Sequence, residues 1–214
     1  MDFSDPYALD FEGLQLVVMD TVQADDTLPL SPEVVIERYA RDFEHAADLS
    51  TGNTWLVSHR PIWALRPKPA KKHQPPPDEC DNLAIPRLTV ENMNVTAQAA
   101  LAVSRLSGRL PPEVDVVVTS HVHVGEVLSF TGRRPPQVVV GIGGTKLLPA
   151  VTDGLVGRLI DGERVTHATM LSAHGFFGFR PRRRDAWRAD VVDVSGGSLA
   201  ACQIRDKRAH CETR

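Results

Sequence analysis

The sequence predicts a mixed α/β fold, in which a mixed β-sheet sandwich is flanked by helices and a β-rich part follows towards the C-terminus. Two observations predict this class. Short apolar runs of strand length alternate with two segments of helical character over the first 150 residues, and from Gly154 onward short apolar stretches alternate with Gly and Asp turns. We therefore divide the chain into residues 1–150 and a β-rich extension, 151–214, packed on the same domain.

The first elements are a strand, a helix and a second strand. Residues 13–20 form a short apolar run between turn formers, which is typical of a buried strand. Ser31 is placed to cap a helix over 32–49, where apolar residues recur at helical spacing. The compact run 54–58 predicts another buried strand, and it delivers His59 at its C-terminal end, where α/β proteins place ligand-binding groups.

The middle of the chain predicts a loop, a helix and three strands. Residues 66–86 contain six prolines, so we expect a surface loop or lid without regular structure. The Ala-rich segment 92–110 favours a helix that stops before two prolines. The valine-rich run 114–119 predicts a buried strand, and two further strands are predicted after it, at 126–130 and 137–141.

Composition is that of a soluble globular domain and limits the partners. The 214 residues are 42% hydrophobic and 24% charged, with a net charge of −3, so there is no basic excess for nucleic acid or an anionic membrane to bind. The arginine run at 180–184 is expected to be a solvated hairpin tip. No apolar run approaches the ~20 residues of a membrane span. The acidic start of the chain does not read as a secretory signal, so a cytoplasmic location is expected as the sequence is written.

The strongest chemical feature is the pair His121 and His123, which follows directly after the strand predicted at 114–119. His59 follows another strand, and the C-terminal ends of parallel strands open onto one edge of a sheet. We therefore expect His59, His121 and His123 to converge. Neutral imidazole is a good ligand for zinc, iron and manganese, and a hydrolytic metal site uses the ion to activate water.

Three further features of the sequence bear on its structure or its chemistry. Asp20 also stands at the end of a predicted strand. It could bind a metal ion or be a solvated turn residue, and the sequence supports both alternatives equally. The segment 141–146 is glycine-rich but lacks the spacing of a phosphate-binding loop, so it predicts close backbone packing near the site. Cys202 and Cys211 could pair across a terminal hairpin or stay reduced, and the sequence leaves both alternatives open.

Four segments resemble the calcineurin-like metallophosphoesterases, specifically their bacterial branch. Residues 55–63 are similar to the family's single-histidine motif, and residues 119–130 to its GHxH motif with the following strand. Residues 135–145 and 175–179 are similar to later segments of the family. The resemblance covers nearly the whole chain and implies a phosphoesterase in which metal-activated water attacks a phosphate ester.

The resemblance also implies an incomplete metal site. In the family five motifs build a dinuclear centre, and only the last two occur here, so His59, His121 and His123 are the implied ligands. The DxH, GDxxD and GNH motifs, with the bridging aspartate and the general-acid histidine, do not occur, and catalytic and substrate-binding residues are unknown. Ser120 also stands in place of the glycine of GHxH. Three imidazoles without a bridging carboxylate predict at most one bound Mn, Fe or Zn ion.

Two functional hypotheses follow from this pattern. One is a metal-dependent phosphoesterase acting on a phosphate ester; the other is a catalytically inactive, truncated remnant or subunit that retains part of the metal site. A wrong start, a broken gene or a split protein would each explain the absent motifs, and family relatives often carry export signals that would lie upstream of Met1. Uncovered strand edges then predict self-association, or a second chain that supplies the remaining half.

Overall fold

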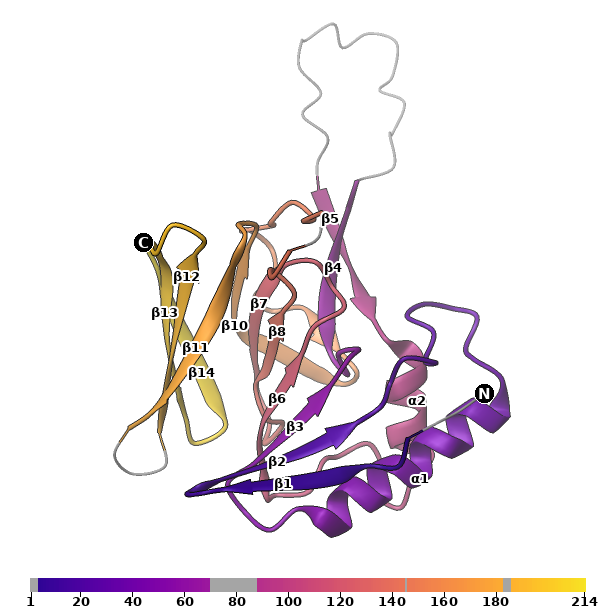
Figure 1. Cartoon of the computed structure of the whole chain (residues 1–214). Coiled ribbons are helices and arrows are strands. Elements are labelled where there is room, and N and C mark those ends of the chain that lie inside the picture. Colours follow the sequence, from indigo (N-terminus) through magenta and orange to yellow (C-terminus); the bar gives the residue numbers. More distant parts are fainter. Residues whose placement is uncertain (1–3, 70–87, 145, 183–185) are drawn as a thin grey trace, which may run out of the picture.

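The computed structural model describes residues 4–69, 88–144, 146–182 and 186–214, and it is a β-rich mixed fold with two helices among these residues (Figure 1). The strands lie in an eight-stranded, a four-stranded and a two-stranded sheet. None of the described helices is long and apolar enough to cross a membrane.

The eight-stranded sheet has the order β1-β2-β3-β6-β8-β7-β10-β9. Its middle strands β2, β3, β6 and β8 run parallel, and the strands towards both edges pair antiparallel. Parallel pairing explains the nearly continuous apolar runs of the middle strands, which are covered on both faces. The strands are β1 (Tyr7–Phe11), β2 (Leu14–Met19), β3 (Thr54–Ser58), β6 (Val114–Thr119), β7 (Gly125–Phe130), β8 (Gln137–Val140), β9 (Leu159–Ile160) and β10 (Glu163–Leu171).

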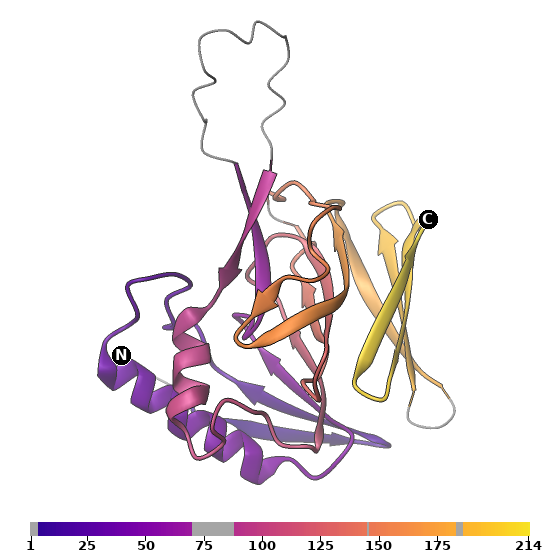
Figure 2. The same ribbon diagram turned by 180° about the vertical axis from the view of Figure 1, so that it is seen from behind.

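Both helices pack on one face of this sheet, where the largest hydrophobic core lies (Figure 2). Helix α1 (Glu33–Leu49) buries Tyr39 and Phe43 completely, and helix α2 (Val95–Val103) packs beside it. The predicted helix at 32–49 is confirmed, but its predicted cap is wrong. The Ser31 hydroxyl instead accepts the Asp25 N–H and donates to the Asp25 carboxylate, because this loop folds back before the helix starts.

The helix predicted at 92–110 is shorter at both ends. Residues up to Met93 belong to a strand, and Asn94 adopts a left-handed conformation from which its side chain accepts the Ala97 N–H. This cap defines where α2 begins. At the other end Ser104 leaves the helical conformation, and the Ser104 hydroxyl donates to the Leu101 carbonyl, so the helix stops before Gly108.

Part of the proline-rich segment forms a strand, which corrects the expectation of no regular structure at 66–86. β4 (Ala64–Pro69) pairs with β5 (Leu88–Met93) in an antiparallel hairpin, although β4 contains two prolines. A two-stranded sheet has only edge strands, where a residue without an N–H is tolerated. The remainder of that segment, 70–86, lies outside the described residues.

The predicted antiparallel character after residue 154 is confirmed, and most of it is a four-stranded meander, β11-β12-β13-β14. Its inner face packs against the eight-stranded sheet on the side away from the helices, where Trp55 of β3 contacts Phe179 and Trp187 edge-on. The strands are β11 (Gly175–Pro181), β12 (Trp187–Asp193), β13 (Ser198–Arg205) and β14 (Arg208–Thr213).

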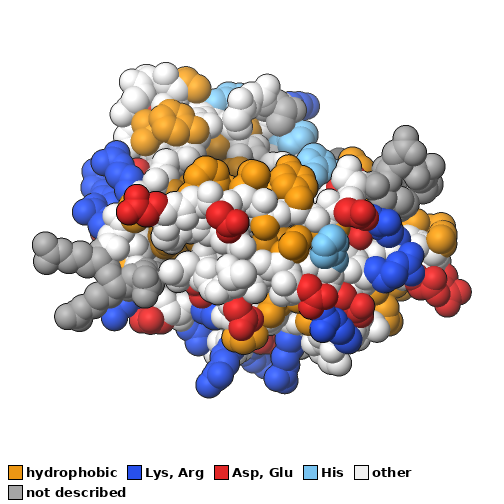
Figure 3. Space-filling model, turned by 60° about the horizontal axis from the view of Figure 1, so that its bottom comes forward, with side chains coloured by type: hydrophobic (Ala, Val, Ile, Leu, Met, Phe, Trp, Pro, Cys, Tyr) orange, Lys and Arg blue, Asp and Glu red, His pale blue; other side chains and the backbone are white. Residues whose placement is uncertain are grey.

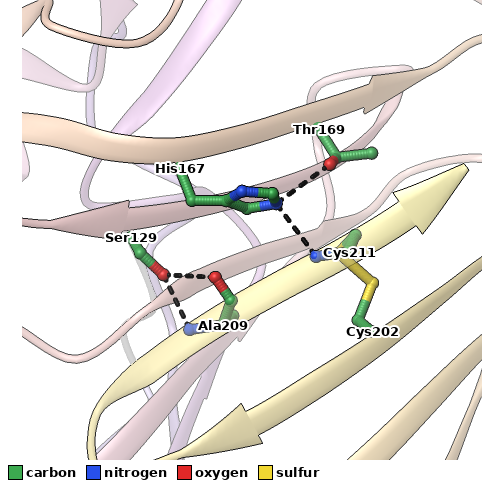
Figure 4. Close-up of a disulfide and its surroundings, with 6 residues drawn as sticks. All are labelled: Ser129, His167, Thr169, Cys202, Ala209 and Cys211. Atoms are coloured by element: carbon green, nitrogen blue, oxygen red, sulfur yellow. Dashed lines mark hydrogen bonds between the residues drawn. A yellow bond between two sulfur atoms is a disulfide. The ribbon is translucent and has the colours of Figure 1, made fainter.

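A disulfide joins β13 to β14, which decides between the two alternatives that the sequence left open. Cys202 and Cys211 are directly opposed in the strand register and are bonded through their sulfur atoms (Figure 4). The Cys211 N–H donates to Nε2 of His167 on β10, and Ser129 on β7 exchanges hydrogen bonds with the backbone of Ala209. β14 is thereby tied to both its own sheet and the larger one.

Reducing this disulfide is expected to lower the free energy of unfolding by about 2–3 kcal/mol, because the bond closes a loop of about ten residues and restricts the unfolded chain. Denaturant unfolding with and without a thiol reductant measures the difference. The double variant Cys202→Ser, Cys211→Ser should be insensitive to reductant. Equal stability of the native chain in both conditions would contradict the prediction.

Glu126 on β7 is a carboxyl group inside the core. Its side chain is fully buried, and both carboxyl oxygens accept the N–H of Leu65 at the start of β4. Burial raises the pKa of Glu126 from 4.5 to about 8, and the Leu65 hydrogen bond offsets only part of this effect. The folded chain therefore holds a proton here that the unfolded chain releases above pH 4.5.

This difference makes stability fall as the pH rises from about 4.5 to 8, by at most about 1.4 kcal/mol per pH unit for this group. Glu126→Gln removes the titration, so its stability relative to the native chain should increase between pH 5 and pH 8. Denaturant unfolding across this range measures the change, with Glu12→Gln at an exposed turn as the control. Parallel pH curves for native chain and Glu126→Gln would refute the assignment.

Candidate metal centre

His59 and His121 meet where β3 and β6 end. The parallel register pairs Ser58 with Thr119, so the residues that follow leave the sheet at the same level. The Ser120 N–H donates to the His59 carbonyl at 3.1 Å, which fixes the two strand ends to each other. His121 has a φ of +59°, an uncommon conformation for a residue with a side chain. This backbone turn directs its ring towards His59.

The ring nitrogens of these two histidines are neighbours. Nδ1 of His121 lies 3.2 Å from Nε2 of His59, with the rings edge-on to each other. Two nitrogens bound to one ion at about 2.1 Å are about 3.0–3.4 Å apart for ordinary coordination angles. The separation of the two imidazoles therefore fits a shared divalent metal ion as well as it fits a direct hydrogen bond.

Asp26 and Arg60 fix the orientation of the His121 ring. Nε2 of His121 lies 2.9 Å from Oδ2 of Asp26 and 3.0 Å from Nη1 of Arg60, which also pairs with Asp26. Guanidinium only donates and an ionised carboxylate only accepts, so Nε2 of His121 can satisfy one of these two contacts at a time, and in the tautomer with its proton on Nε2 it donates to Asp26. The Nδ1 lone pair of His121 then faces His59, as in metal-bound histidines that are held by a carboxylate.

The electrostatics of this cluster favour an ionised Asp26 and a neutral His59. Burial by itself would raise the pKa of Asp26, but the hydrogen bonds from His121 and Arg60 lower it below its ordinary value. For His59, burial and then the charges of His121 and Arg60 lower the pKa. A neutral imidazole keeps a free lone pair, which metal binding requires.

His123 is held separately from the other two rings. Its Nδ1 lies 3.1 Å from the carbonyl oxygen of Lys146, which can only accept, so Nδ1 carries the proton and Nε2 is left as the free lone pair. Within the described part of the chain, no three His, Cys, Asp or Glu side chains have an arrangement that could hold a metal ion. The contact between His59 and His121 is thus present, and metal ligation by all three histidines stays a prediction.

The other two candidate features differ in outcome. Oδ1 of Asp20 accepts the Val22 N–H at 2.9 Å, as an acidic side chain does in a local turn. Gly141 lies against the loop between the two histidines of the HxH motif: a Cβ at this position would be 1.9 Å from the Val122 carbonyl oxygen. Close backbone packing is therefore confirmed at Gly141, whereas a Cβ at Gly143 or Gly144 would meet no atom within 4 Å.

Asp26 and Arg60 were missed from the sequence. Asp26 follows no strand and lies in the β2–α1 loop, 95 residues before its partner His121, so local pattern carries no signal for it. Arg60 stands next to His59, and the buried hydroxyl of Thr21 accepts its backbone N–H at 2.7 Å. An arginine directly after a candidate ligand was the one available hint.

No protein-family model matches this sequence, and no curated protein matches it. Among solved structures, the chain is similar to purple acid phosphatase PPD1 from seeds of yellow lupin (Lupinus luteus), with a TM-score of 0.47 and 15% sequence identity. The alignment covers 93% of this chain and 32% of the lupin protein, so the chain spans about a third of that protein's length.

Gly141→Ala is expected to displace the loop between His121 and His123, because the new methyl group cannot share space with the Val122 carbonyl oxygen. We expect a loss of about 1–3 kcal/mol in the free energy of unfolding, the range for overpacked sites, and altered imidazole NMR signals of both histidines. Gly143→Ala is the matched control, since a Cβ there meets no atom within 4 Å. Identical behaviour of the two variants would show that the contact has no structural importance.

Proposed function

We propose that this chain carries part of the active site of a divalent-metal-dependent phosphoesterase, and that His59 and His121 bind one metal ion together. The observation that supports this best is the 3.2 Å separation between Nε2 of His59 and Nδ1 of His121 at two adjacent strand ends. The resemblance of residues 55–63 and 119–130 to metallophosphoesterase motifs supplies the reaction class. A phosphate ester is the proposed substrate, with Mn, Fe or Zn as the ion.

Each residue of the cluster has a distinct part in this proposal. His59 and His121 provide the ligand nitrogens, and His123 offers its free Nε2 from the same loop. Asp26 holds the proton on Nε2 of His121 and so keeps Nδ1 available, while Arg60 keeps Asp26 ionised. A bound divalent ion would lower the pKa of its water and neutralise charge on a phosphoryl group.

A second candidate function is a catalytically inactive remnant or subunit that binds a metal without hydrolysis. It is favoured by the donor set itself, because only two of the predicted ligands are in contact and no carboxylate bridges them among the described residues. Two imidazoles bind an ion far more weakly than the three or four protein ligands of established zinc sites. A second chain would then have to supply the remaining ligands.

Metal binding and hydrolysis are measured separately on the same chain. Titration with Zn²⁺ or Mn²⁺, followed by calorimetry, should show one ion per chain and an affinity that falls at least about tenfold in His59→Ala and in His121→Ala. Asp26→Asn should weaken binding by about 10- to 100-fold, the usual effect of removing such a partner carboxylate. His45→Ala, on the exposed surface of α1, is the matched control.

Hydrolysis of a chromogenic phosphodiester then separates the two functions. Turnover that needs Mn²⁺, and that is lost with a chelator and in His121→Ala, supports the phosphoesterase. Metal binding without turnover favours the inactive remnant. If the native chain binds no ion, or if His45→Ala weakens binding as much as His121→Ala, both proposals are wrong.

A further inference from the structure

β1 is an edge strand without a second partner among the described residues. It is hydrogen-bonded to β2 alone, through five consecutive residue pairs from Tyr7–Val18 to Phe11–Leu14, and no bulge interrupts them. Natural edge strands are usually protected from pairing by lysines, by internal prolines or by bulges. β1 has no lysine, internal proline or bulge, and the exposed Asp10 is the one charged residue in its sequence, Tyr-Ala-Leu-Asp-Phe.

One face of β1 exposes a row of large apolar side chains. Tyr7 is 50% exposed, Leu9 44% and Phe11 58%. Their partners in β2 lie on the face of the eight-stranded sheet against which the four-stranded sheet packs. The four-stranded sheet does not extend over β1, so this face of β1 stays uncovered. The view from below shows hydrophobic side chains gathered on this side of the molecule (Figure 3). Contiguous exposed apolar surface of this kind marks interaction sites.

The strand is also complementary to itself. In an antiparallel pair of two β1 strands with Leu9 opposite Leu9, each Tyr7 faces the Phe11 of the other copy. Each Asp10 then faces an Ala8, so no like charges are opposed. The apolar residues of both copies lie on one face of the joined sheet, as the twofold alternation of a strand requires. Cross-strand aromatic pairs of this kind are favourable.

Neighbouring registers that keep this alternation are worse. A shift that centres the pair on Asp10 places two carboxylates directly opposite each other. A shift that centres it on Ala8 places Asp10 opposite Pro6, which has no N–H to donate. On the other face of the strand Asp10 is exposed, so helix α1 does not cover this end of the edge.

From these observations we propose that β1 is a docking edge for a second copy of this chain, which pairs antiparallel across a twofold axis at Leu9 and joins the two eight-stranded sheets. The pairing uses the free backbone groups of the edge and buries Tyr7, Leu9 and Phe11 against their counterparts. It involves no residue of the metal centre and is independent of the proposed catalytic function.

Sedimentation equilibrium of the native chain at micromolar concentration should give the mass of a dimer. Leu9→Lys places two ammonium groups at the axis and should weaken dimerisation at least tenfold. Val194→Lys, at another exposed apolar position, is the matched control and should remain a dimer. A monomeric native chain, or a dimer that Leu9→Lys leaves intact, would overturn the proposal, and a different partner would then have to cover this edge.

Single cysteines test the register without depending on the folding of Leu9→Lys. In a Cys80→Ser background, Leu9→Cys should form an intermolecular disulfide with itself on mild oxidation. Tyr7→Cys and Phe11→Cys should cross-link with each other when mixed, and neither should cross-link efficiently alone. Equal self-linking of all three variants, or of none, would exclude a strand pair centred on Leu9.

Discussion

The candidate centre depends on the parallel alignment of β3 with β6. Their register places Ser58 beside Thr119. His59 follows the end of β3 directly, and His121 follows the end of β6 after one intervening residue. A slip of one residue would turn either side chain to the opposite face of the sheet and separate the rings. Burial of both strands in the middle of the sheet, with apolar residues on each face, makes such a slip costly. The geometry of the two imidazoles is thus a consequence of core packing.

Strand pattern was sufficient to predict this much of the molecule. The runs 54–58 and 114–119 are short, apolar and bounded by turn formers. The sequence alone therefore predicts both strands and the proximity of His59 to His121. β1 could not, because its alternation of exposed apolar and polar residues carries no core signal. β4 was missed for a different reason: two prolines exclude a central strand, but they are compatible with a two-stranded hairpin.

Long-range polar contacts account for what sequence pattern cannot supply at the site. Asp26 contacts His121 from the β2–α1 loop, which is separated from His121 in the chain by α1 and much of the sheet. Its ionised state depends on its contacts with Arg60 and His121. No periodicity encodes such a contact. The positive φ of His121 is likewise not encoded by any pattern in the sequence.

Two buried polar side chains on neighbouring strands then set how firmly the region after His59 is held. Gln137 on β8 accepts the N–H groups of Ile62 and Trp63 through Oε1 and donates through Nε2 to the Thr119 hydroxyl. It joins the ends of the two site strands with a group that does not titrate. Glu126 accepts the N–H of Leu65, two residues after Trp63, through a carboxyl group that does titrate. Gln137 therefore holds the strand ends beside the histidines through contacts that do not change with pH. Ionisation of Glu126, by contrast, leaves a buried charge that the Leu65 N–H compensates only in part, and so lowers the stability of the fold.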